Sequence, residues 1–160
     1  MTDIDDTRFM VLALEQAKKS RNEGGVPVGA AFVVDGEVRG VGHNQRVQLG
    51  SVIRHGETDC LENIGRLPAS VYRRGTLYTT LSPCSMCTGT ILLYGIGRVV
   101  IGESATFTGP EHLLREAGVE IVPLDDPACV EMMRAFIAEK PELWHEDIGV
   151  DDETSGPGVD

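Results

Sequence analysis

Two short motifs contain residue types that could bind a metal ion and transfer protons. The first is His55-Gly56-Glu57 and the second is Pro83-Cys84-Ser85-Met86-Cys87. Cys84 and Cys87 are three residues apart, so on a helix their thiols lie on one face. In the first turn of a helix, the positive end of the helix dipole lowers the pKa of a thiol and favours the thiolate, which is the form that binds metals.

Zinc prefers sulfur and imidazole ligands, and His55, Cys84 and Cys87 supply three of them. A catalytic zinc keeps three protein ligands and an open position for water, whereas a structural zinc normally has four protein ligands. Because no plausible fourth ligand lies near the motifs, the sequence predicts one catalytic Zn²⁺ per chain. Glu57 is two residues from His55, so it reaches the same site only if the helix is approached end-on. In that arrangement it is the catalytic carboxylate that carries protons.

Each motif also has an ordinary interpretation when it is taken alone. A C-x-x-C pair can be a redox pair or half of a structural zinc site, and His-x-Glu occurs by chance. A thioredoxin-like redox site fits poorly, because it has no His-x-Glu partner upstream. Together, with 28 residues between His55 and Cys84 and with Pro83 before the first cysteine, the motifs match the H-x-E…P-C-x-x-C signature of zinc deaminases.

The two motifs lie where a strand or loop leads into a helix. Apolar spacing predicts a first helix that ends at Gly24-Gly25, and Asp35-Gly36 is typical of a hairpin turn between two strands. Ser82-Pro83 is typical of an N-cap followed by a first-turn proline. The expected strands are residues 26–34, 37–42, 76–81, 98–102 and 119–123. The expected helices include residues 55–64, 111–117 and 127–139. We also expect a long polar loop over residues 43–54 and an acidic segment over residues 141–147. This order predicts an α/β fold, with three α/β/α layers around a central mixed five-stranded sheet.

The chain length and composition are those of one soluble domain. The chain has 160 residues, of which 41% are hydrophobic and 24% charged. We expect residues 1–149 to form a single deaminase domain and residues 150–160 to form an acidic, disordered tail. The apolar runs are far shorter than a membrane span, and the acidic N-terminus does not resemble a signal peptide, so we expect a cytoplasmic protein with no membrane partner. Four cysteines in that compartment argue against a disulfide framework.

The net charge of −11 argues against a nucleic-acid partner. Residues 139–160 contain eight acidic residues and one lysine, and the remainder of the chain still has 17 acidic against 13 basic residues. The only compact basic run is Arg73-Arg74, whereas phosphate backbones require clusters of lysine and arginine.

Over roughly residues 9–149 the chain resembles the cytidine deaminase-like superfamily, and within it the fungal type of cytosine deaminase. Besides the two zinc motifs, the resemblance rests on Glu23-Gly24-Gly25-Val26-Pro27-Val28-Gly29, Gly42-His43-Asn44, Leu61-Glu62-Asn63, Tyr78-Thr79-Thr80-Leu81-Ser82 and Trp144-His145-Glu146-Asp147-Ile148-Gly149. The last motif is the most specific, because superfamily members that act on nucleosides or RNA do not share it.

The resemblance implies hydrolytic deamination of a free pyrimidine base, cytosine to uracil and ammonia, with 5-substituted cytosines as further substrates. It also implies a homodimer. Glu57 would move protons between water and the base. The residues that would bind the base are Asn44, the backbone N–H of Gly56, Ser82, Val28, Phe107, Trp144 and Asp147. Cys60 and Cys129 are expected to be buried free thiols, and His43, His112 and His145 are not expected to bind the metal.

The chain departs from the family pattern near the expected pocket. Thr58-Asp59-Cys60 follows Glu57 where relatives have more apolar and hydroxyl residues, and Val28 replaces a slightly larger aliphatic residue. The identity of the base therefore stays open, with isocytosine, guanine or a related amino-heterocycle as alternatives. A deaminase of bases in tRNA or single-stranded DNA is disfavoured by the charge and the Trp144–Asp147 motif, and a non-catalytic zinc module is disfavoured by the missing fourth ligand.

Overall fold

The fold is a mixed sheet between two layers of helices. The computed structural model describes residues 3–151, with side chains from Asp6 onward. The strands are β1 (Gly29–Val34), β2 (Glu37–His43), β3 (Gly75–Thr79), β4 (Arg98–Ile101) and β5 (Glu120–Pro123). The helices are α1 (Asp3–Asn22), α2 (Arg46–Leu49), α3 (Gly56–Ile64), α4 (Ala69–Arg73), α5 (Ser85–Tyr94), α6 (Glu111–Glu116), α7 (Pro127–Glu139) and α8 (Pro141–Asp147).

The strands form a five-stranded sheet in the order β2-β1-β3-β4-β5. Strand β1 is antiparallel to both β2 and β3, whereas β3, β4 and β5 are parallel. Asp35 and Gly36 both have positive φ, at 52° and 79°, as expected for the tight turn that joins β1 to β2. The predicted three-layer α/β/α fold with a mixed five-stranded sheet is therefore confirmed.

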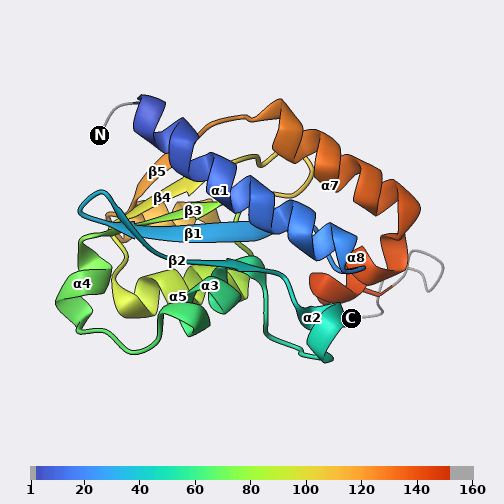
Figure 1. Cartoon of the computed structure of the whole chain (residues 1–160), viewed down its shortest axis with the longest axis horizontal. Coiled ribbons are helices and arrows are strands. Elements are labelled where there is room, and N and C mark those ends of the chain that lie inside the picture. Colours follow the sequence, from blue (N-terminus) through green and yellow to red (C-terminus); the bar gives the residue numbers. More distant parts are fainter. Residues whose placement is uncertain (1–2, 152–160) are drawn as a thin grey trace.

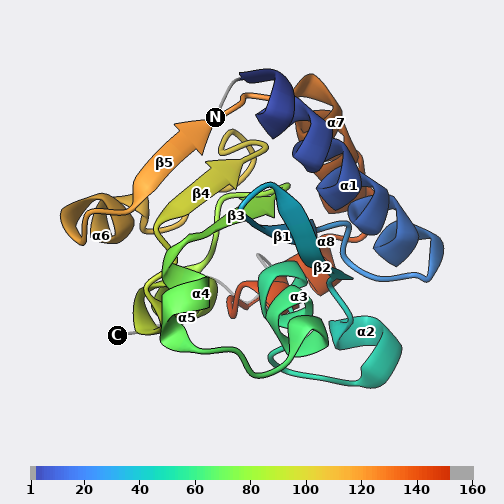
Figure 2. The same ribbon diagram turned by 60° about the vertical axis from the view of Figure 1, so that its left-hand side comes forward.

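Both faces of the sheet are covered by helices, as Figures 1 and 2 show. Helices α1 and α7 lie on one face, and α3, α4 and α5 lie on the other. Since side chains alternate along a strand, Phe32 of β1 packs in the core on the α3 and α5 side, whereas Ala31 and Val33 pack in the core on the α1 side. Residues 29–34 are buried throughout, because β1 is a central strand.

Three short helices were not predicted. Helix α2 lies within the expected loop, α4 precedes β3, and the acidic segment forms α8. Helices of four to seven residues are too short to show a hydrophobic period. The start of α5 was also predicted incorrectly: its N-cap is Cys84 rather than Ser82, and β1 begins at Gly29 rather than at residue 26. Of the predicted tail, residues 152–160 lie outside the described residues.

A buried ion pair joins α1 to the sheet. Both carboxylate oxygens of Asp6 accept hydrogen bonds from the Arg98 guanidinium, at 2.7 and 2.8 Å, and Oδ1 also accepts from the Tyr78 hydroxyl at 2.8 Å. The hydrogen bonds from Arg98 hold the pKa of Asp6 below its usual range, against the opposing effect of burial. Asp6 is only 1% exposed, so removal of its carboxylate would leave a partly buried Arg98 without its buried partner and with Glu120, at 3.0 Å, on the exposed side.

We expect Asp6→Asn to lower the free energy of unfolding by about 3 kcal/mol at pH 7. Because the pKa of the folded carboxyl is lowered, its stabilisation is complete above the pKa of an unfolded aspartate and is lost as the pH falls through the folded value. Urea unfolding of both proteins at pH 7 and at lower pH measures this. The difference should shrink below about pH 4, and a difference that stays constant over the range would contradict the explanation.

Candidate metal centre and active site

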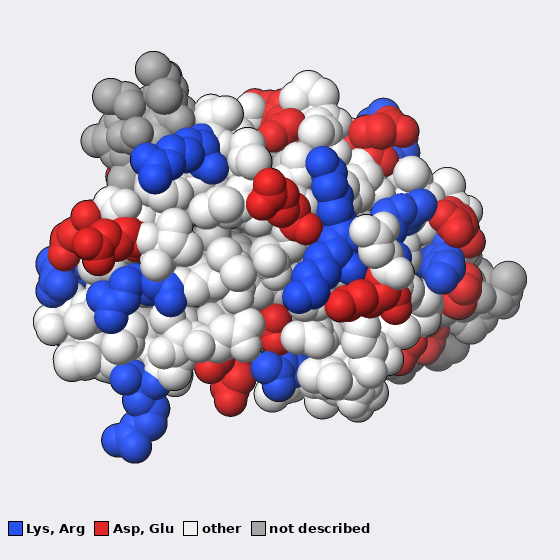
Figure 3. Space-filling view, viewed as in Figure 1, with Lys and Arg blue, Asp and Glu red and all other residues white. Residues whose placement is uncertain are grey.

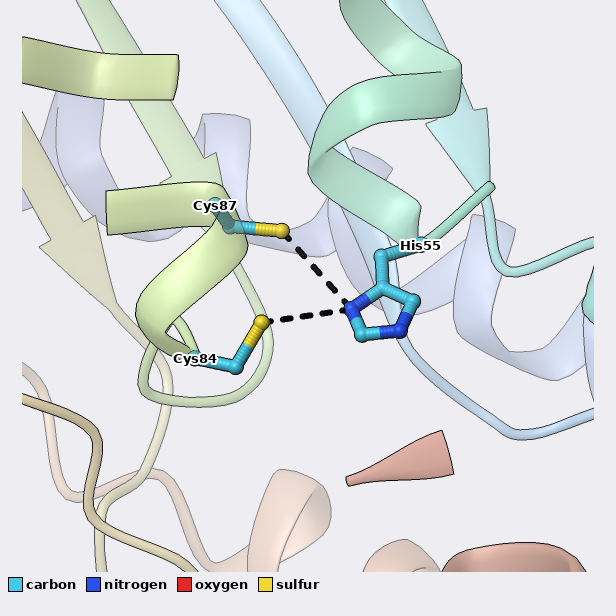
Figure 4. Close-up of side chains that lie close together, drawn as sticks. All are labelled: His55, Cys84 and Cys87. Carbon is cyan, nitrogen blue, oxygen red and sulfur yellow. Dashed lines mark hydrogen bonds between the residues drawn. The ribbon is translucent and has the colours of Figure 1, made fainter. Parts of the chain in front are cut away.

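The three predicted metal ligands meet where the N-terminal ends of α3 and α5 face each other (Figure 4). His55 is the N-cap of α3, Cys84 is the N-cap of α5, and Cys87 is the third residue of α5. The His55 Nδ1 atom lies 3.4 Å from the Sγ of Cys84 and 3.8 Å from the Sγ of Cys87. All three candidate ligand atoms lie within 4.8 Å of one another.

These distances fit a tetrahedral zinc ion. Zinc–sulfur bonds of about 2.3 Å and zinc–nitrogen bonds of about 2.0–2.1 Å place a sulfur and a nitrogen roughly 3.6 Å apart around one metal. The two observed distances lie on either side of that value. Among the described residues, the cluster contains one histidine and two cysteines and no fourth ligand. The donor set therefore fits a zinc site with one open coordination position.

The electrostatics of the cluster favour the metal-binding form of Cys84. The side-chain hydrogen bond from Cys87, with a second from His55, lowers the pKa of Cys84 to about 4 against the effect of burial. Burial disfavours the charged form of His55, but its hydrogen bond with Cys84 and the nearby charge of Asp147 raise its pKa to about 9. A metal ion that binds here displaces the proton held by His55.

Glu57, the second residue of α3, is 4% exposed and faces the same site. Burial, with the neighbouring charge of Cys84, raises the pKa of Glu57 to about 7. A carboxyl group with a pKa near neutrality can both accept and donate protons. His55 has an extended backbone with ψ of 172° and precedes the helix, so the two residues reach the site from the end of α3. This is the end-on arrangement that the sequence required.

A small hollow opens beside these residues, and its empty space together with adjoining open solvent is about 280 Å³. Its lining residues are Val28, Asn44, His55, Glu57, Leu81, Ser82, Cys84, Phe107, Trp144, Asp147 and Ile148. The six predicted base-contacting side chains all line this hollow. Gly56 is the first residue of α3, where an added Cβ would lie 2.9 Å from the Val28 carbonyl oxygen. Leu81 and Ile148 were not predicted as site residues, although both fall within motifs of the family resemblance.

Asn44 and Asp147 form a hydrogen-bonded pair in the hollow. Asn44 Nδ2 donates to Asp147 Oδ1 at 2.7 Å, and Asn44 Oδ1 accepts from the Arg46 backbone N–H at 3.0 Å. The other Asp147 oxygen lies 3.6 Å from His55 Nε2, and the Arg46 guanidinium lies 3.9 Å from Oδ1. Burial raises the pKa of Asp147. These contacts place the end of α8 against both α2 and the metal ligands.

Two aromatic side chains cover another side of the hollow. Phe107 and Trp144 pack edge to face, with their ring centroids 5.6 Å apart and an interplanar angle of 83°. The loop that carries Phe107 is held by Glu103, whose carboxylate accepts from the backbone N–H groups of Ala105 and Thr106 at 2.7 and 2.9 Å. The hydrophobic cluster around Trp144 also includes Phe136 of α7. The aromatic pair thus connects α8 to the loop between β4 and α6.

Ser82 lines the hollow, but its hydroxyl group is already engaged. It donates to Glu111 Oε2 at 2.7 Å and accepts from the Gly109 N–H at 2.9 Å. Because a hydroxyl oxygen has two lone pairs, the Ser82 hydroxyl can still accept one hydrogen bond from a ligand.

The remaining cysteines and His43 lie outside the cluster, as predicted. Cys60 and Cys129 are buried free thiols, and burial raises the pKa of each, that of Cys129 to about 12. His43 forms hydrogen bonds with Gln16 and Glu23, at 3.2 and 2.8 Å.

Removal of the metal should lower both stability and activity. We expect one zinc per chain, and we expect a chelator to remove it with loss of turnover that added zinc restores. Binding to the folded chain alone stabilises it by about 4 kcal/mol when free zinc is 1,000 times its Kd, so the melting temperature should rise with added zinc. Elemental analysis and thermal unfolding measure this. Cys129→Ala is the matched control and should still bind one zinc, whereas Cys87→Ala should not.

Together, an α/β/α domain, a three-ligand zinc site at two helix N-termini and a buried carboxylate define a zinc-dependent hydrolase. The family model described as "Cytidine and deoxycytidylate deaminase zinc-binding region" matches residues 3–103. The chain belongs to this zinc-dependent deaminase family, so the predicted enzyme class and the zinc cofactor are confirmed.

Known proteins with similar sequences are deaminases. The cytosine deaminase of Candida albicans is 56% identical over 146 residues, which cover 91% of this chain and 97% of that protein. A tRNA-specific adenosine deaminase of Bacillus subtilis is 36% identical over 98 residues, 61% of each chain.

Solved structures share the fold. A tRNA:A34 deaminase has a TM-score of 0.67 at 26% identity, over 79% of this chain and 99% of that one. The guanine deaminase of Nitrosomonas europaea has a TM-score of 0.66 at 23% identity, over 81% of this chain and 83% of that one, and supports the fold alone.

Proposed function

We propose that this protein hydrolyses free cytosine to uracil and ammonia, and that 5-substituted cytosines are further substrates. The observation that carries the proposal is the Asn44–Asp147 pair. It joins residues 103 positions apart in the sequence and lies in a small hollow beside the metal ligands. A carboxylate beside an amide provides acceptors and donors for the polar edge of one heterocyclic ring. The similarity to the C. albicans cytosine deaminase extends over nearly all of both chains, which supports the same reaction.

In this proposal, His55, Cys84 and Cys87 hold the zinc, and the base lies against it between Val28 and the aromatic pair. Asn44 binds the ring edge, and Asp147 accepts a hydrogen bond from the exocyclic amino group. The Gly56 N–H binds the ring carbonyl oxygen, as the first N–H groups of a helix have no partner within the helix. Phe107 and Trp144 exclude water from the ring. Ser82 also lines the hollow and would contact the base.

Glu57 is the catalytic residue of the proposed reaction. When bound, zinc supplies a water acidic enough to act as a nucleophile near neutral pH. As the oxygen of that water bonds to the ring carbon, Glu57 accepts a proton from the water and delivers it to the neighbouring ring nitrogen. Glu57 then accepts the remaining proton of the added hydroxyl group and delivers it to the amino group, so the carbon–nitrogen bond breaks, the carbonyl forms and ammonia leaves.

The free base is a better candidate than a base within a nucleic acid. Arg46 and Trp144 hold α8 against the hollow, so a polynucleotide strand would have to displace that helix. On the face shown in Figure 3, lysine and arginine side chains lie among aspartate and glutamate side chains rather than in one continuous basic strip. A phosphate backbone binds to clustered positive charge.

A screen for ammonia release tests the substrate directly. The zinc-loaded protein is supplied separately with cytosine, 5-methylcytosine, isocytosine, guanine, cytidine and a tRNA. We expect release from cytosine and 5-methylcytosine and much less from the other compounds. Release from isocytosine or guanine but not from cytosine would move the proposal to that base. Release from the tRNA alone would overturn the free-base substrate class.

We also propose that residues 1–149 act as one domain in a cytoplasmic homodimer. Support for the dimer comes from α5, whose Leu92, Leu93 and Tyr94 are 37%, 75% and 43% exposed. Beside them, α3 and α4 form a hollow lined in part by apolar side chains. Support for the compartment comes from the four free cysteines. Among the described helices, none has the length and hydropathy needed to cross a bilayer. The mass of the protein in solution tests the dimer.

A further inference from the structure

The carboxylate of Asp59, outside the hollow, holds the segment between Asn44 and His55, two residues that line the hollow. Asp59 of α3 is completely buried, with an exposed fraction of 0%, and it does not line the hollow. Its Oδ1 accepts from Gln45 Nε2 at 3.0 Å and from Arg54 Nε at 2.9 Å. Its Oδ2 accepts from the His43 backbone N–H at 3.0 Å and from Asn63 Nδ2 at 3.4 Å. This buried charge is therefore fully paired, as burial requires.

Three of the four donors to Asp59 come from the two ends of one segment, residues 43–55. His43 and Gln45 flank Asn44, and Arg54 precedes His55. The Gln45 N–H also donates to the Arg54 carbonyl at 2.9 Å, which closes the segment into a loop. One carboxylate thus ties the neighbours of Asn44 to the neighbour of His55.

The backbone of Asn44 is held by hydrogen bonds that do not involve Asp59, so Asp59 affects the residues that follow it. The Asn44 N–H donates to the Val28 carbonyl at 2.9 Å, and its carbonyl accepts from the Ser20 hydroxyl at 2.7 Å. These bonds hold Asn44 against α1 and against the residue that precedes β1, whether or not Asp59 is present. After Asn44 the Gln48 side chain holds the chain near α1, since its Nε2 lies 3.1 Å from Ser20 Oγ. Gln45 and Arg54 hold the two ends of residues 45–54 to Asp59.

The path of the chain after Asn44 sets the orientation of the Asn44 side-chain amide. The Arg46 N–H donates to Asn44 Oδ1, and this bond directs Nδ2 toward Asp147. Arg46 also places its guanidinium near Asp147. If residues 45–54 shift, the amide loses the bond that selects its orientation, and Asp147 loses a neighbouring positive charge.

We propose that Asp59 is a positioning residue for base binding, which fixes the Asn44 amide and Asp147 through residues 45–54. The inference rests on the proposed function of that site. Asp59 acts on contacts that are present both in the bound substrate and in the transition state, so its loss raises KM more than it lowers kcat.

The test compares Asp59→Asn with Asp6→Asn, the matched control. Asp6 is also buried and paired with an arginine, but it joins α1 to β4 and does not line the hollow. With rates expressed per bound zinc, we expect Asp59→Asn to raise KM for cytosine about tenfold and to change kcat by less than about threefold. Asp6→Asn should be less stable with an unchanged KM. A purely structural role for Asp59 predicts the same behaviour for both variants, and that result would overturn the proposal.

A milder variant covers the case in which Asp59→Asn does not fold. Gln45→Ala removes one of the four donors without stranding a charge, because Gln45 is neutral and partly exposed. We expect it to raise KM by about threefold. An unchanged KM in Gln45→Ala, with Asp59→Asn unfolded, would also overturn the proposal.

A readout that needs no substrate separates this inference from the proposed function. Hydrogen–deuterium exchange should rise within residues 43–55 in Asp59→Asn and in Gln45→Ala, but not in Asp6→Asn. If the wild-type protein does not act on cytosine, the proposed function fails, and exchange still decides the positioning role. Unchanged exchange in this segment would contradict that role even in an active enzyme.

Discussion

Glu57→Gln is expected to lower kcat on cytosine by about 10³-fold or more while the protein keeps one zinc per chain. Glutamine has nearly the same shape as glutamate but cannot accept the proton of water at neutral pH. The substitution therefore impairs proton transfer and leaves the metal ligands unchanged. In the proposed site these ligands are His55, Cys84 and Cys87. Because Glu57 is buried, bulk water does not readily carry out the proton transfers in its place.

Steady-state kinetics and zinc analysis on the same preparation measure this effect. Glu62→Gln is the matched control, because Glu62 lies on the same helix and is exposed. It should retain wild-type kcat, KM and zinc content. A fully active Glu57→Gln would refute the proposed mechanism, whereas an inactive variant without zinc would assign Glu57 a role in metal binding instead.

Truncation after Lys140 is expected to abolish detectable turnover and to leave the zinc in place. It removes α8, and with it Asp147 and Trp144. In the proposed function the base then loses a hydrogen-bond acceptor and one of its two aromatic covers, and the hollow opens to water. The metal ligands come from α3 and α5 and keep their positions. Loss of Trp144 also removes a member of a hydrophobic cluster, so we expect a lower melting temperature.

Two further proteins distinguish the loss of specific contacts from general destabilisation. Truncation after Asp151 keeps α8 and should remain fully active. Asp147→Ala keeps the helix and its tryptophan, and should lose at least about 100-fold in kcat/KM through the missing acceptor. Zinc content, melting temperature and cytosine kinetics are measured for all three proteins. Substantial activity in the protein truncated after Lys140 would show that α8 does not complete the site.

The metal cluster was accessible from sequence because local geometry determines it. Cys84 and Cys87 lie at the start of one helix, and three residues of separation place their thiols together whatever the tertiary structure is. His55 joins them only through the packing of α3 against the sheet, and the joint motif indicated this where spacing alone could not. The five strands were likewise predicted, since β-rich runs between turn residues are a local signal.

Other parts of the site depend on contacts that no local pattern encodes. Helix α8 has no hydrophobic period of its own, and it forms where Trp144 packs against the Phe107 loop and Asp147 meets Asn44. Ser82 looked like a helix cap, but its hydroxyl instead binds Glu111, which is 29 residues away. Asp59 appeared only as a departure from the family pattern. Its buried hydrogen bonds to residues 43–54 became visible only in three dimensions.

The stoichiometry of products from cytosine is the most direct test of the proposed reaction. Zinc-loaded protein is incubated with cytosine, and uracil and ammonia are quantified in the same samples over time, with the chelated protein in parallel. We expect equal amounts of uracil and ammonia, formed in proportion to bound zinc and absent after chelation. If cytosine remains unchanged at full zinc occupancy, the protein does not have the proposed activity.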